Sequence, residues 1–376
     1  MTSLEGGCPN CGGSDSHYSS NLRDWTLVSS DARPLKGQVD LIQCEQCGHI
    51  YKVPTKAWQD ATDEIYRTYE IYHQSGGAEQ KVRNDSAGGL VSRSSMLVKR
   101  LTDYCDLPAE GSILDFGCGN GAFLNAVHAV RPNWHLAGSD INLGFKESIK
   151  GISSNAKFIQ GGLDEIQDKY DVISLVHCIE HLTEPKYFVQ RLARHLKPTG
   201  MMFLQCPNVS ANPFDLLIYD HVSHFTPGHL ASTVATAGLG PVALLSGLDE
   251  KENSLVAGPG VTARPYETTW DAGLLERQIG VLDKSFRFYD ELAARAGKVG
   301  IFGTSIAGTW LANSTDRKPD FFVDEDASRI GRNYYGRPII GPNEVPADAK
   351  VFVPLAPGVA HEVCKRLGAD RYLYAV

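Results

Sequence analysis

The sequence predicts an α/β protein with three parts: a small cysteine-rich ribbon, a central domain with a mostly parallel sheet, and a smaller C-terminal α/β domain. Three observations support this prediction. Two Cys-x-x-Cys pairs lie within the first 50 residues, and glycine-rich strand–turn–helix patterns occupy residues 112–130 and 298–308. Between residues 112 and 260, apolar strand-like runs alternate with helical patterns, which favours a parallel sheet with helices on both faces.

The composition agrees with a globular protein of several domains. A chain of 376 residues is long enough for two or three domains. Its net charge of −8 argues against general nucleic-acid or membrane-surface binding, which needs a basic face. The N-terminus lacks a signal-peptide pattern and no run of about 18 apolar residues occurs. We expect a cytoplasmic chain that acts on a small molecule, with no nucleic-acid or membrane partner and with a monomer favoured.

Four of the nine cysteines predict a structural zinc site. Cys8, Cys11, Cys44 and Cys47 form two Cys-x-x-Cys pairs, each followed by glycine. Two such pairs can supply the four thiolates of a tetrahedral zinc ion, and a complete shell leaves no position for a catalytic water. A redox role is the weaker alternative because it needs only one pair. The odd cysteine count argues against a disulfide framework.

The segment 112–121 predicts a ligand-binding turn. A short apolar, strand-like run ends at Asp115, and Gly117, Gly119 and Gly121 follow at two-residue spacing before a helical pattern begins. Glycine permits positive φ and a close approach of the backbone to a ligand. The leading carboxylate repels phosphate but suits a cation or ribose hydroxyls. This arrangement resembles the first motif of class I S-adenosylmethionine-dependent methyltransferases, which implies a Rossmann-like sheet and that cofactor.

Further cofactor contacts are expected at the ends of the next strands. Asp140 lies about 20 residues beyond the glycines, where an acid accepts hydrogen bonds from ribose hydroxyls; Ile141 follows it. After the third strand, either Asp164 reaches the adenine or Leu163 gives only backbone and apolar contact. The fourth strand leads into a turn that begins at His177 and includes His181.

Two further segments are candidates for the chemistry. Residues 54–90 contain recurring aromatics and a polar, glycine-rich end, which favours a packed helix followed by a loop over an active-site lid. Asp220 and His221 precede Thr226-Pro227. They form either a base with its partner or a buried helix start, and histidine is well suited to moving protons near neutral pH.

The C-terminal part carries a second glycine-rich turn. Its sequence, Gly303-x-Ser305-x-x-Gly308, lacks the middle glycine of a dinucleotide fingerprint, although Asp324 supplies an acid about 20 residues on. Supporting the central domain, or binding part of the substrate, is therefore favoured over binding a nicotinamide-type cofactor.

The whole chain resembles the zinc-containing deoxysugar C-methyltransferases, which act on nucleotide-linked keto sugars. That resemblance implies a catalytic tyrosine at Tyr72, in the segment Tyr72-His73-Gln74-Ser75, acid/base work at Asp220 and His221, and a catalytic role for His181. The chain departs from the family pattern in two places. Asp220 replaces a glutamate, and Ile218 stands where the family has a tyrosine.

These observations predict four segments and one principal activity. The segments are a zinc-binding domain (1–55), an aromatic lid or linker (56–91), a methyltransferase domain (92–262) and a C-terminal α/β domain (263–376). The expected activity is C-methylation through an enolate, with His221 oriented by Asp220 as base and Tyr72 assisting. The alternatives are O-methylation of a hydroxyl and a non-catalytic zinc-ribbon binding protein.

Overall fold

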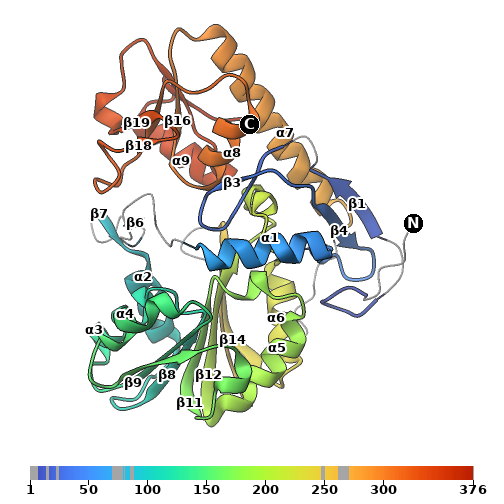
Figure 1. The fold of residues 1–376 in the computed structure, drawn as a ribbon, viewed down its shortest axis with the longest axis vertical. Coiled ribbons are helices and arrows are strands. Elements are labelled where there is room, and N and C mark those ends of the chain that lie inside the picture. Colours follow the sequence, from blue (N-terminus) through green and yellow to red (C-terminus); the bar gives the residue numbers. More distant parts are fainter. Residues whose placement is uncertain are drawn as a thin grey trace.

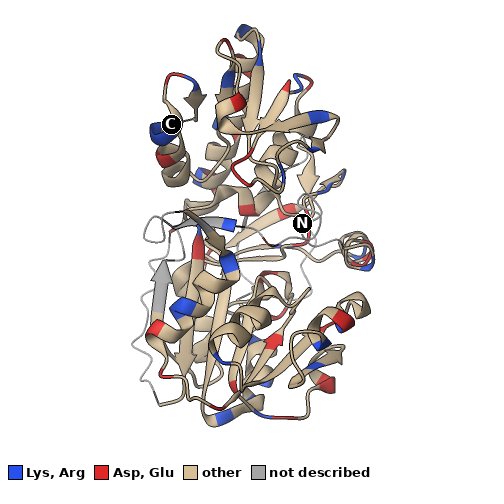
Figure 2. Cartoon of the chain, turned by 90° about the vertical axis from the view of Figure 1, so that its left-hand side faces the viewer, with Lys and Arg blue, Asp and Glu red and all other residues tan. Residues whose placement is uncertain are grey.

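The computed structural model describes residues 7–13, 17–22, 25–69, 79, 81–84, 89–246, 250–260 and 271–375. Figure 1 shows the C-terminal domain at one end of the long axis and the central domain at the other, with the N-terminal module beside their junction. Within the described residues, no helix is long and apolar enough to cross a membrane. In the view of Figure 2, basic and acidic residues are interspersed rather than gathered into one field.

The central domain is built on a seven-stranded sheet in the order β10-β9-β8-β11-β12-β15-β14. Strands β8 to β12 pair in parallel, and β15 alone runs against them, because β12 and β14 both pair with it antiparallel. The bounds are β8 Ser112–Phe116, β9 His135–Asp140, β10 Ala156–Gln160, β11 Tyr170–Val176, β12 Leu196–Pro207, β14 Gly240–Ser246 and β15 Glu252–Gly258.

Helices cover both faces of this sheet, which explains its near-continuous apolar strands. Ile113 and Leu114 of β8 are fully buried in two different clusters, one on each face. The helices are α2 Arg93–Tyr104, α3 Ala122–Val130, α4 Lys146–Lys150, α5 Pro185–Leu192 and α6 Pro227–Ala235; the short 3₁₀ turns are η3 Leu143–Phe145, η4 Leu163–Glu165, η5 Ile179–His181, η6 Ala193–His195 and η7 Pro213–Leu217. The predicted α/β fold class is confirmed.

The sheet of the N-terminal module includes one strand from the central part of the chain. Its sheet has the order β1-β4-β5-β13, and β13 comes from Ser223–His224, far along the chain. The other elements are β1 His17–Asn21, β2 Leu27–Val28, β3 Pro34–Leu35, β4 Asp40–Cys44, β5 Ile50–Lys52 and α1 Lys56–Arg67. A separate hairpin, β6 Lys81–Asn84 and β7 Gly89–Ser92, leads into α2.

The C-terminal domain has a six-stranded sheet in the order β18-β19-β17-β16-β20-β21. Its bounds are β16 Val299–Phe302, β17 Phe321–Val323, β18 Asn333–Tyr334, β19 Arg337–Ile340, β20 Lys350–Phe352, β21 Tyr372–Leu373, α7 Leu274–Arg295, α8 Ile306–Ser314, η8 Pro342–Glu344 and α9 Pro357–Leu367.

The N-terminal module and the C-terminal domain share one hydrophobic core. A single buried cluster joins Leu27 and Trp58 of the module to Leu282, Trp310 and Phe322 of the C-terminal domain. Trp25 packs edge-on against Trp310, with ring centroids 5.4 Å apart. Burial of these side chains therefore stabilises both parts at once. The four-segment division drawn from the sequence stays a prediction.

Candidate active site and cysteine cluster

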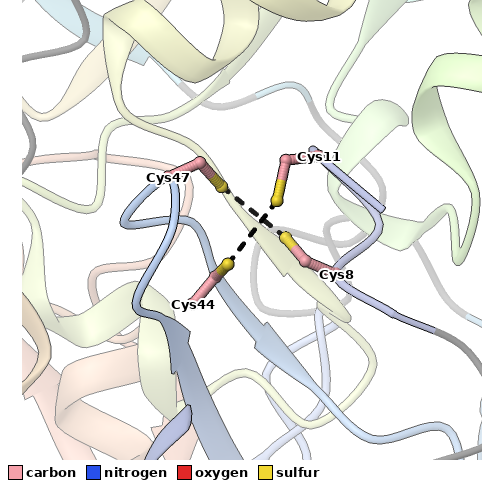
Figure 3. A group of neighbouring side chains, drawn as sticks. All are labelled: Cys8, Cys11, Cys44 and Cys47. Carbon is pink, nitrogen blue, oxygen red and sulfur yellow. Dashed lines mark hydrogen bonds between the residues drawn. The ribbon is translucent and has the colours of Figure 1, made fainter. Parts of the chain in front are cut away.

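The four predicted cysteines converge on one point (Figure 3). The Sγ atoms of Cys8 and Cys47 are 3.7 Å apart, and those of Cys11 and Cys44 are 3.6 Å apart. A tetrahedral zinc ion with Zn–S bonds of about 2.3 Å requires sulfur–sulfur edges of about 3.8 Å. The cluster is therefore compatible with a zinc ion bound by four thiolates.

The electrostatics of the cluster agree with a cation. The contact between Cys8 and Cys47 holds the pKa of Cys8 far above its usual range and that of Cys47 far below it, and burial raises the pKa of Cys11 to about 11. Backbone N–H groups of Asn10 and Gly13 donate to Cys8 Sγ and Cys11 Sγ, each at 3.4 Å, as expected around a charged thiolate. A zinc ion would take the place of the protons that the closely spaced cysteine thiols otherwise keep.

The cysteine cluster contacts the central domain through α6. His229 Nε2 lies 2.7 Å from the carbonyl oxygen of Cys47, and Ser232 Oγ donates to Asn10 Oδ1 at 3.1 Å. The second cysteine loop thus rests on the helix that immediately follows the Asp220–His221 segment.

The first glycine turn joins β8 to α3. Gly117 and Gly119 have φ of 74° and 50°, and a Cβ atom at Gly117 would lie 2.9 Å from Cys178 Sγ. Asp140, at the end of β9, accepts a hydrogen bond from Gly119 N at 2.9 Å. The turn and this carboxylate are therefore held together before any ligand arrives.

Burial makes the two carboxylates at this turn favourable for a cationic ligand. Burial raises the pKa of Asp115 to about 7, although the hydrogen bond that Ser174 Oγ donates to it at 2.7 Å lowers this pKa. Burial also raises the pKa of Asp140. A positive charge nearby stabilises the ionised carboxylates, and ribose hydroxyls can donate to Asp140. The donor set thus fits the sulfonium and ribose groups of S-adenosylmethionine.

One cavity of about 530 Å³ contains this turn and extends to all three parts of the chain. Its lining includes Asp115, Gly117, Gly119, Asp140, Ile141, His177, His181 and His221 among the predicted residues. Ser30–Ala32 and Tyr66 contribute from the N-terminal module, and Ser305, Ile306 and Arg329 from the C-terminal domain.

His177 sits in a charged network at the edge of this cavity. Its φ of 50° is unusual for a residue with a side chain and places strain at the site. Arg93 contacts His177 Nε2 and donates to Glu252 Oε1 at 2.9 Å. Because arginine can only donate, Nε2 accepts, and the proton on Nδ1 is donated to Glu180 Oε1 at 3.0 Å.

The partner of His221 is Asp215, not Asp220. His221 Nδ1 lies 2.7 Å from Asp215 Oδ1, and His224 Nδ1 lies 2.6 Å from Asp215 Oδ2. Burial alone would lower the pKa of His221, but Asp215 outweighs it and raises that pKa. Since Nδ1 is engaged, Nε2 is the nitrogen available to a ligand in the cavity.

Asp220 instead fixes the N-terminal loop to the site. Its carboxylate accepts from Ser30 N at 2.8 Å and from Ser30 Oγ at 2.6 Å. The expectation that Asp220 orients His221 is therefore wrong, because the turn η7 brings the earlier Asp215 under the imidazole. Asp220 lies behind His181, whose Nδ1 is 3.0 Å from the Asp220 carbonyl oxygen.

His181 and Tyr66 form a second pair beside His221. The rings of His181 and His221 are 4.7 Å apart and nearly perpendicular, and Tyr66 OH lies 2.9 Å from His181 Nδ1. The carbonyl oxygen of Asp220 can only accept, so His181 Nδ1 carries the proton and the tyrosine oxygen accepts. The hydroxyl hydrogen of Tyr66 is then free for another acceptor. Burial, with the neighbouring His221, lowers the pKa of His181.

The segment that carries Asp215 and His221 is held by the N-terminal module. Ser223 and His224 pair with Tyr51 and Ile50 of β5. Lys52 Nζ donates to the carbonyl oxygen of Ile218, and Trp58 Nε1 donates to that of Tyr219 at 2.9 Å. The cysteine-rich module therefore fixes the position of the candidate base.

Three predicted residues lie outside the cavity lining. Gly121 begins α3 behind the turn, Leu163 packs against the core of the central sheet, and Asp220 is buried. Asp164 pairs with Arg191 at the surface rather than facing the cavity. Tyr72 lies outside the described residues, so its role stays a prediction.

Sequence reasoning missed the cavity residues that belong to no motif. They include Ser30–Ala32, Arg93, Glu252 and Arg329, and Asp215, the partner of His221 outside the lining, was missed as well. Tyr66 had a signal as one of the recurring aromatics of residues 54–90, and Ser305 and Ile306 had one as part of the second glycine turn.

Comparisons with known proteins agree with the geometry of the first turn. Residues 92–244 match a family described as a methyltransferase domain. A ubiquinone biosynthesis O-methyltransferase of Rickettsia felis is 26% identical over 36% of this chain and 58% of its own length. A ubiquinone/menaquinone biosynthesis C-methyltransferase of Vibrio parahaemolyticus is 28% identical over 38% of this chain and 58% of its own length.

The match thus spans 58% of the length of these relatives. Among solved structures, the mitomycin 7-O-methyltransferase has 17% identity and a TM-score of 0.41, with 54% of this chain and 60% of that chain covered. The family match coincides with the glycine turn, the carboxylates and the sheet order described above. Residues 92–244 are therefore a class I methyltransferase domain, the kind that takes its methyl group from S-adenosylmethionine.

Proposed function

We propose that this chain methylates a carbon atom of a nucleotide-linked keto sugar, with His221 as the base and Asp215 as its orienting partner. The observation that carries the proposal is the pair of histidines in the cavity of the glycine turn. Their rings are 4.7 Å apart, yet the pKa of His221 is raised and that of His181 is lowered. Neighbouring groups driven apart in pKa are typical of paired acid/base roles.

The proposed step is an enolisation followed by methyl transfer. His221 Nε2 removes a proton from the carbon next to the ketone, and the C–H electrons form an enolate. The phenol of Tyr66 donates its free hydrogen to the enolate oxygen, as Tyr72 would from the lid. The enolate carbon then takes the methyl group as the S–CH₃ bond breaks. S-adenosylmethionine, when bound, supplies that methyl group already activated as a sulfonium.

The cavity also has a suitable extent for such a substrate. The glycine turn lines one part of the cavity, and residues of the N-terminal loop and of α8 line other parts. A nucleotide-linked sugar has a reactive ring and a second, charged half, so it would use both. The resemblance of the whole chain to deoxysugar C-methyltransferases supports the same substrate class.

We further propose that Cys8, Cys11, Cys44 and Cys47 hold a structural zinc ion. All four sulfurs lie within 4.8 Å of one another, and the donor set is complete without water. The ion would stabilise the module that positions His221 and would take no part in the chemistry.

A screen of nucleotide-linked keto sugars with isotopically labelled S-adenosylmethionine tests the proposal. Mass spectrometry should find one product with a single added methyl group, and NMR should place that methyl on carbon. His221→Ala should lower the rate of product formation by roughly 10²–10⁴-fold while S-adenosylhomocysteine still binds. No methylated sugar with any carrier, despite normal binding of S-adenosylhomocysteine, would contradict the substrate class.

O-methylation is the second candidate. The histidine–carboxylate pair could equally take a proton from a hydroxyl group, and one relative of the domain is named an O-methyltransferase. The same NMR experiment separates the two, because an O-methyl product would carry its label on oxygen. A non-catalytic binding role would require that S-adenosylhomocysteine fails to bind at the intact glycine turn.

A further inference from the structure

Glu180, His181 and His221 bring together a second set of metal-binding atoms, outside the four-cysteine cluster. One carboxylate oxygen of Glu180 and one ring nitrogen of each histidine lie within 4.8 Å of one another. Both histidines line the cavity, and Glu180 precedes His181 in the turn η5. Val222 N donates to the Glu180 carbonyl oxygen at 2.9 Å, which holds this turn against the segment that carries His221.

Each of the two imidazoles already has the hydrogen bond that a metal-ligating histidine makes with its other nitrogen. His221 Nδ1 lies 2.7 Å from Asp215 Oδ1, and His181 Nδ1 lies 3.0 Å from the Asp220 carbonyl oxygen. Histidine ligands usually donate this second N–H to a carboxylate or a backbone carbonyl, which fixes the tautomer and the ring orientation. In the neutral imidazoles, both Nε2 atoms therefore keep a lone pair for a cation.

The carboxylate of Glu180 has one oxygen in use and one without a partner. Oε1 accepts from His177 Nδ1 at 3.0 Å. Oε2 is buried and has no hydrogen-bond partner among the described residues, and Glu180 as a whole is 1% exposed. A buried carboxylate oxygen without a partner is costly, and a cation beside it would satisfy it.

The donor set selects the kind of cation. Two imidazoles and one carboxylate suit Zn²⁺, Co²⁺ or Ni²⁺, whereas Mg²⁺ and Ca²⁺ prefer oxygen ligands. Three protein ligands leave further coordination positions for water or a ligand in the cavity. The site thus differs from the cysteine cluster, whose four thiolates would complete the shell of a zinc ion.

We propose that Glu180, His181 and His221 bind a second divalent transition-metal ion, and that this ion blocks the candidate base. The lone pair on His221 Nε2 can be donated to a metal ion or to a proton, but not to both at once. The metal-bound chain would therefore still bind S-adenosylmethionine but would not enolise the acceptor. Binding of the ion is independent of the proposed function, and only the block rests on it.

Titration with Co²⁺ tests the site, on the full chain with zinc in the cysteine cluster and S-adenosylhomocysteine bound. The visible spectrum should show one bound Co²⁺ without the thiolate charge-transfer band that the cavity residue Cys178 would produce. Glu180→Gln and His181→Gln should each weaken Co²⁺ binding at least tenfold, because loss of even an outer-shell partner costs about 10- to 100-fold. Retained binding of S-adenosylhomocysteine shows that each variant is folded.

His224→Gln is the matched control. It removes a buried histidine from the same Asp215 carboxylate and should leave the Co²⁺ affinity nearly unchanged. A large excess of Mg²⁺ should not displace the Co²⁺, because two of the three donors are nitrogens.

The outcomes separate the metal site from the proposed function. Loss of the bound Co²⁺ in both ligand variants, with retention in His224→Gln, supports the site, and inhibition of methyl transfer at the same Co²⁺ concentration supports the block. No Co²⁺ beyond the zinc, or equal Co²⁺ binding by all variants, overturns the site. Full turnover with Co²⁺ bound overturns the block. Co²⁺ binding as expected, on a chain that methylates no keto sugar, contradicts the proposed function and leaves the site standing.

Discussion

The donor end and the acceptor end of the cavity are built in different ways. The donor end comes from one contiguous turn plus the end of the next strand, so that Gly119 and Asp140 are already hydrogen-bonded to each other. The acceptor end gathers His221, Tyr66, the Ser30 loop and Arg329 from segments far apart in the chain. The donor end therefore depends on local backbone geometry, whereas the acceptor end depends on how three parts pack together.

This difference predicts that the two ends can be damaged separately. Changes in the cysteine-rich module should disable the acceptor chemistry and leave donor binding intact. Changes at the glycine turn should do the reverse.

Removal of the proposed zinc ion should have the largest effect. Metal binding contributes directly to the folding free energy of small thiolate modules. Chelation, or Cys44→Ser, should release β5 from β13 and displace His221, so that methyl transfer is lost. S-adenosylhomocysteine should still bind in calorimetry, and metal analysis should find one zinc per untreated chain. Replacement of the isolated Cys364 by serine is the control, and full activity in zinc-free protein would contradict the assignment.

His221→Ala should lower turnover by roughly 10²–10⁴-fold, because a positioned base is lost. His224 binds the other oxygen of the same Asp215 carboxylate but does not line the cavity. His224→Gln should therefore retain most turnover, provided that thermal unfolding shows both variants folded. Equal losses in the two variants would mean that the pair is structural.

Asp140→Ala should weaken S-adenosylhomocysteine binding by about 10- to 100-fold, the usual loss for hydrogen bonds to a charged group. Asp324 occupies the corresponding position after the second glycine turn but is engaged by Thr304. Asp324→Ala should leave the affinity for S-adenosylhomocysteine unchanged in the same calorimetric titration. A comparable loss of S-adenosylhomocysteine affinity in Asp324→Ala would contradict the assignment of the methyl donor to the first glycine turn.

The pH dependence of turnover should reveal how Asp215 acts on His221, and this effect should be smaller than those above. The pKa of His221 is raised, and a base works only when deprotonated, so activity should fall as the pH drops through a value above about 6.5. In Asp215→Asn the charge that raises this pKa is gone, so the acidic limb should move to lower pH, with plateau turnover reduced roughly tenfold. An unmoved acidic limb in the pH–rate profile would exclude His221 as the titrating base.

Residues within local motifs were predictable, and residues brought together by packing were not. Asp115, Gly117, Gly119 and the cysteine pairs lie where their spacing indicated, because tight turns impose that spacing on contiguous residues. Asp220 was chosen as the partner of His221 because it precedes His221 in the sequence and matches the acid of the family pattern. The turn η7 instead places Asp215, six residues earlier, beneath the ring.

The remaining acceptor residues show why a single sequence falls short. Ala32, in the loop that binds Asp220, has a φ of 66°. Glycine is the residue that usually indicates a positive φ in a sequence, so an alanine at this position gives no such indication. Arg329 lies in no motif, and its relevance depends on the C-terminal domain sharing a core with the N-terminal module. The pairing of β13 with β5 joins residues more than 170 positions apart, which no local pattern encodes.

The central claim is that His221 acts as a base on carbon at the acceptor end. Incubation of the methyl-accepting keto sugar with the chain in heavy water, without S-adenosylmethionine, measures this most directly by NMR. The account predicts exchange of the hydrogen next to the ketone, and its loss in His221→Ala but not in His224→Gln. No exchange above the uncatalysed rate with the unmodified chain, despite binding of that sugar, would contradict it.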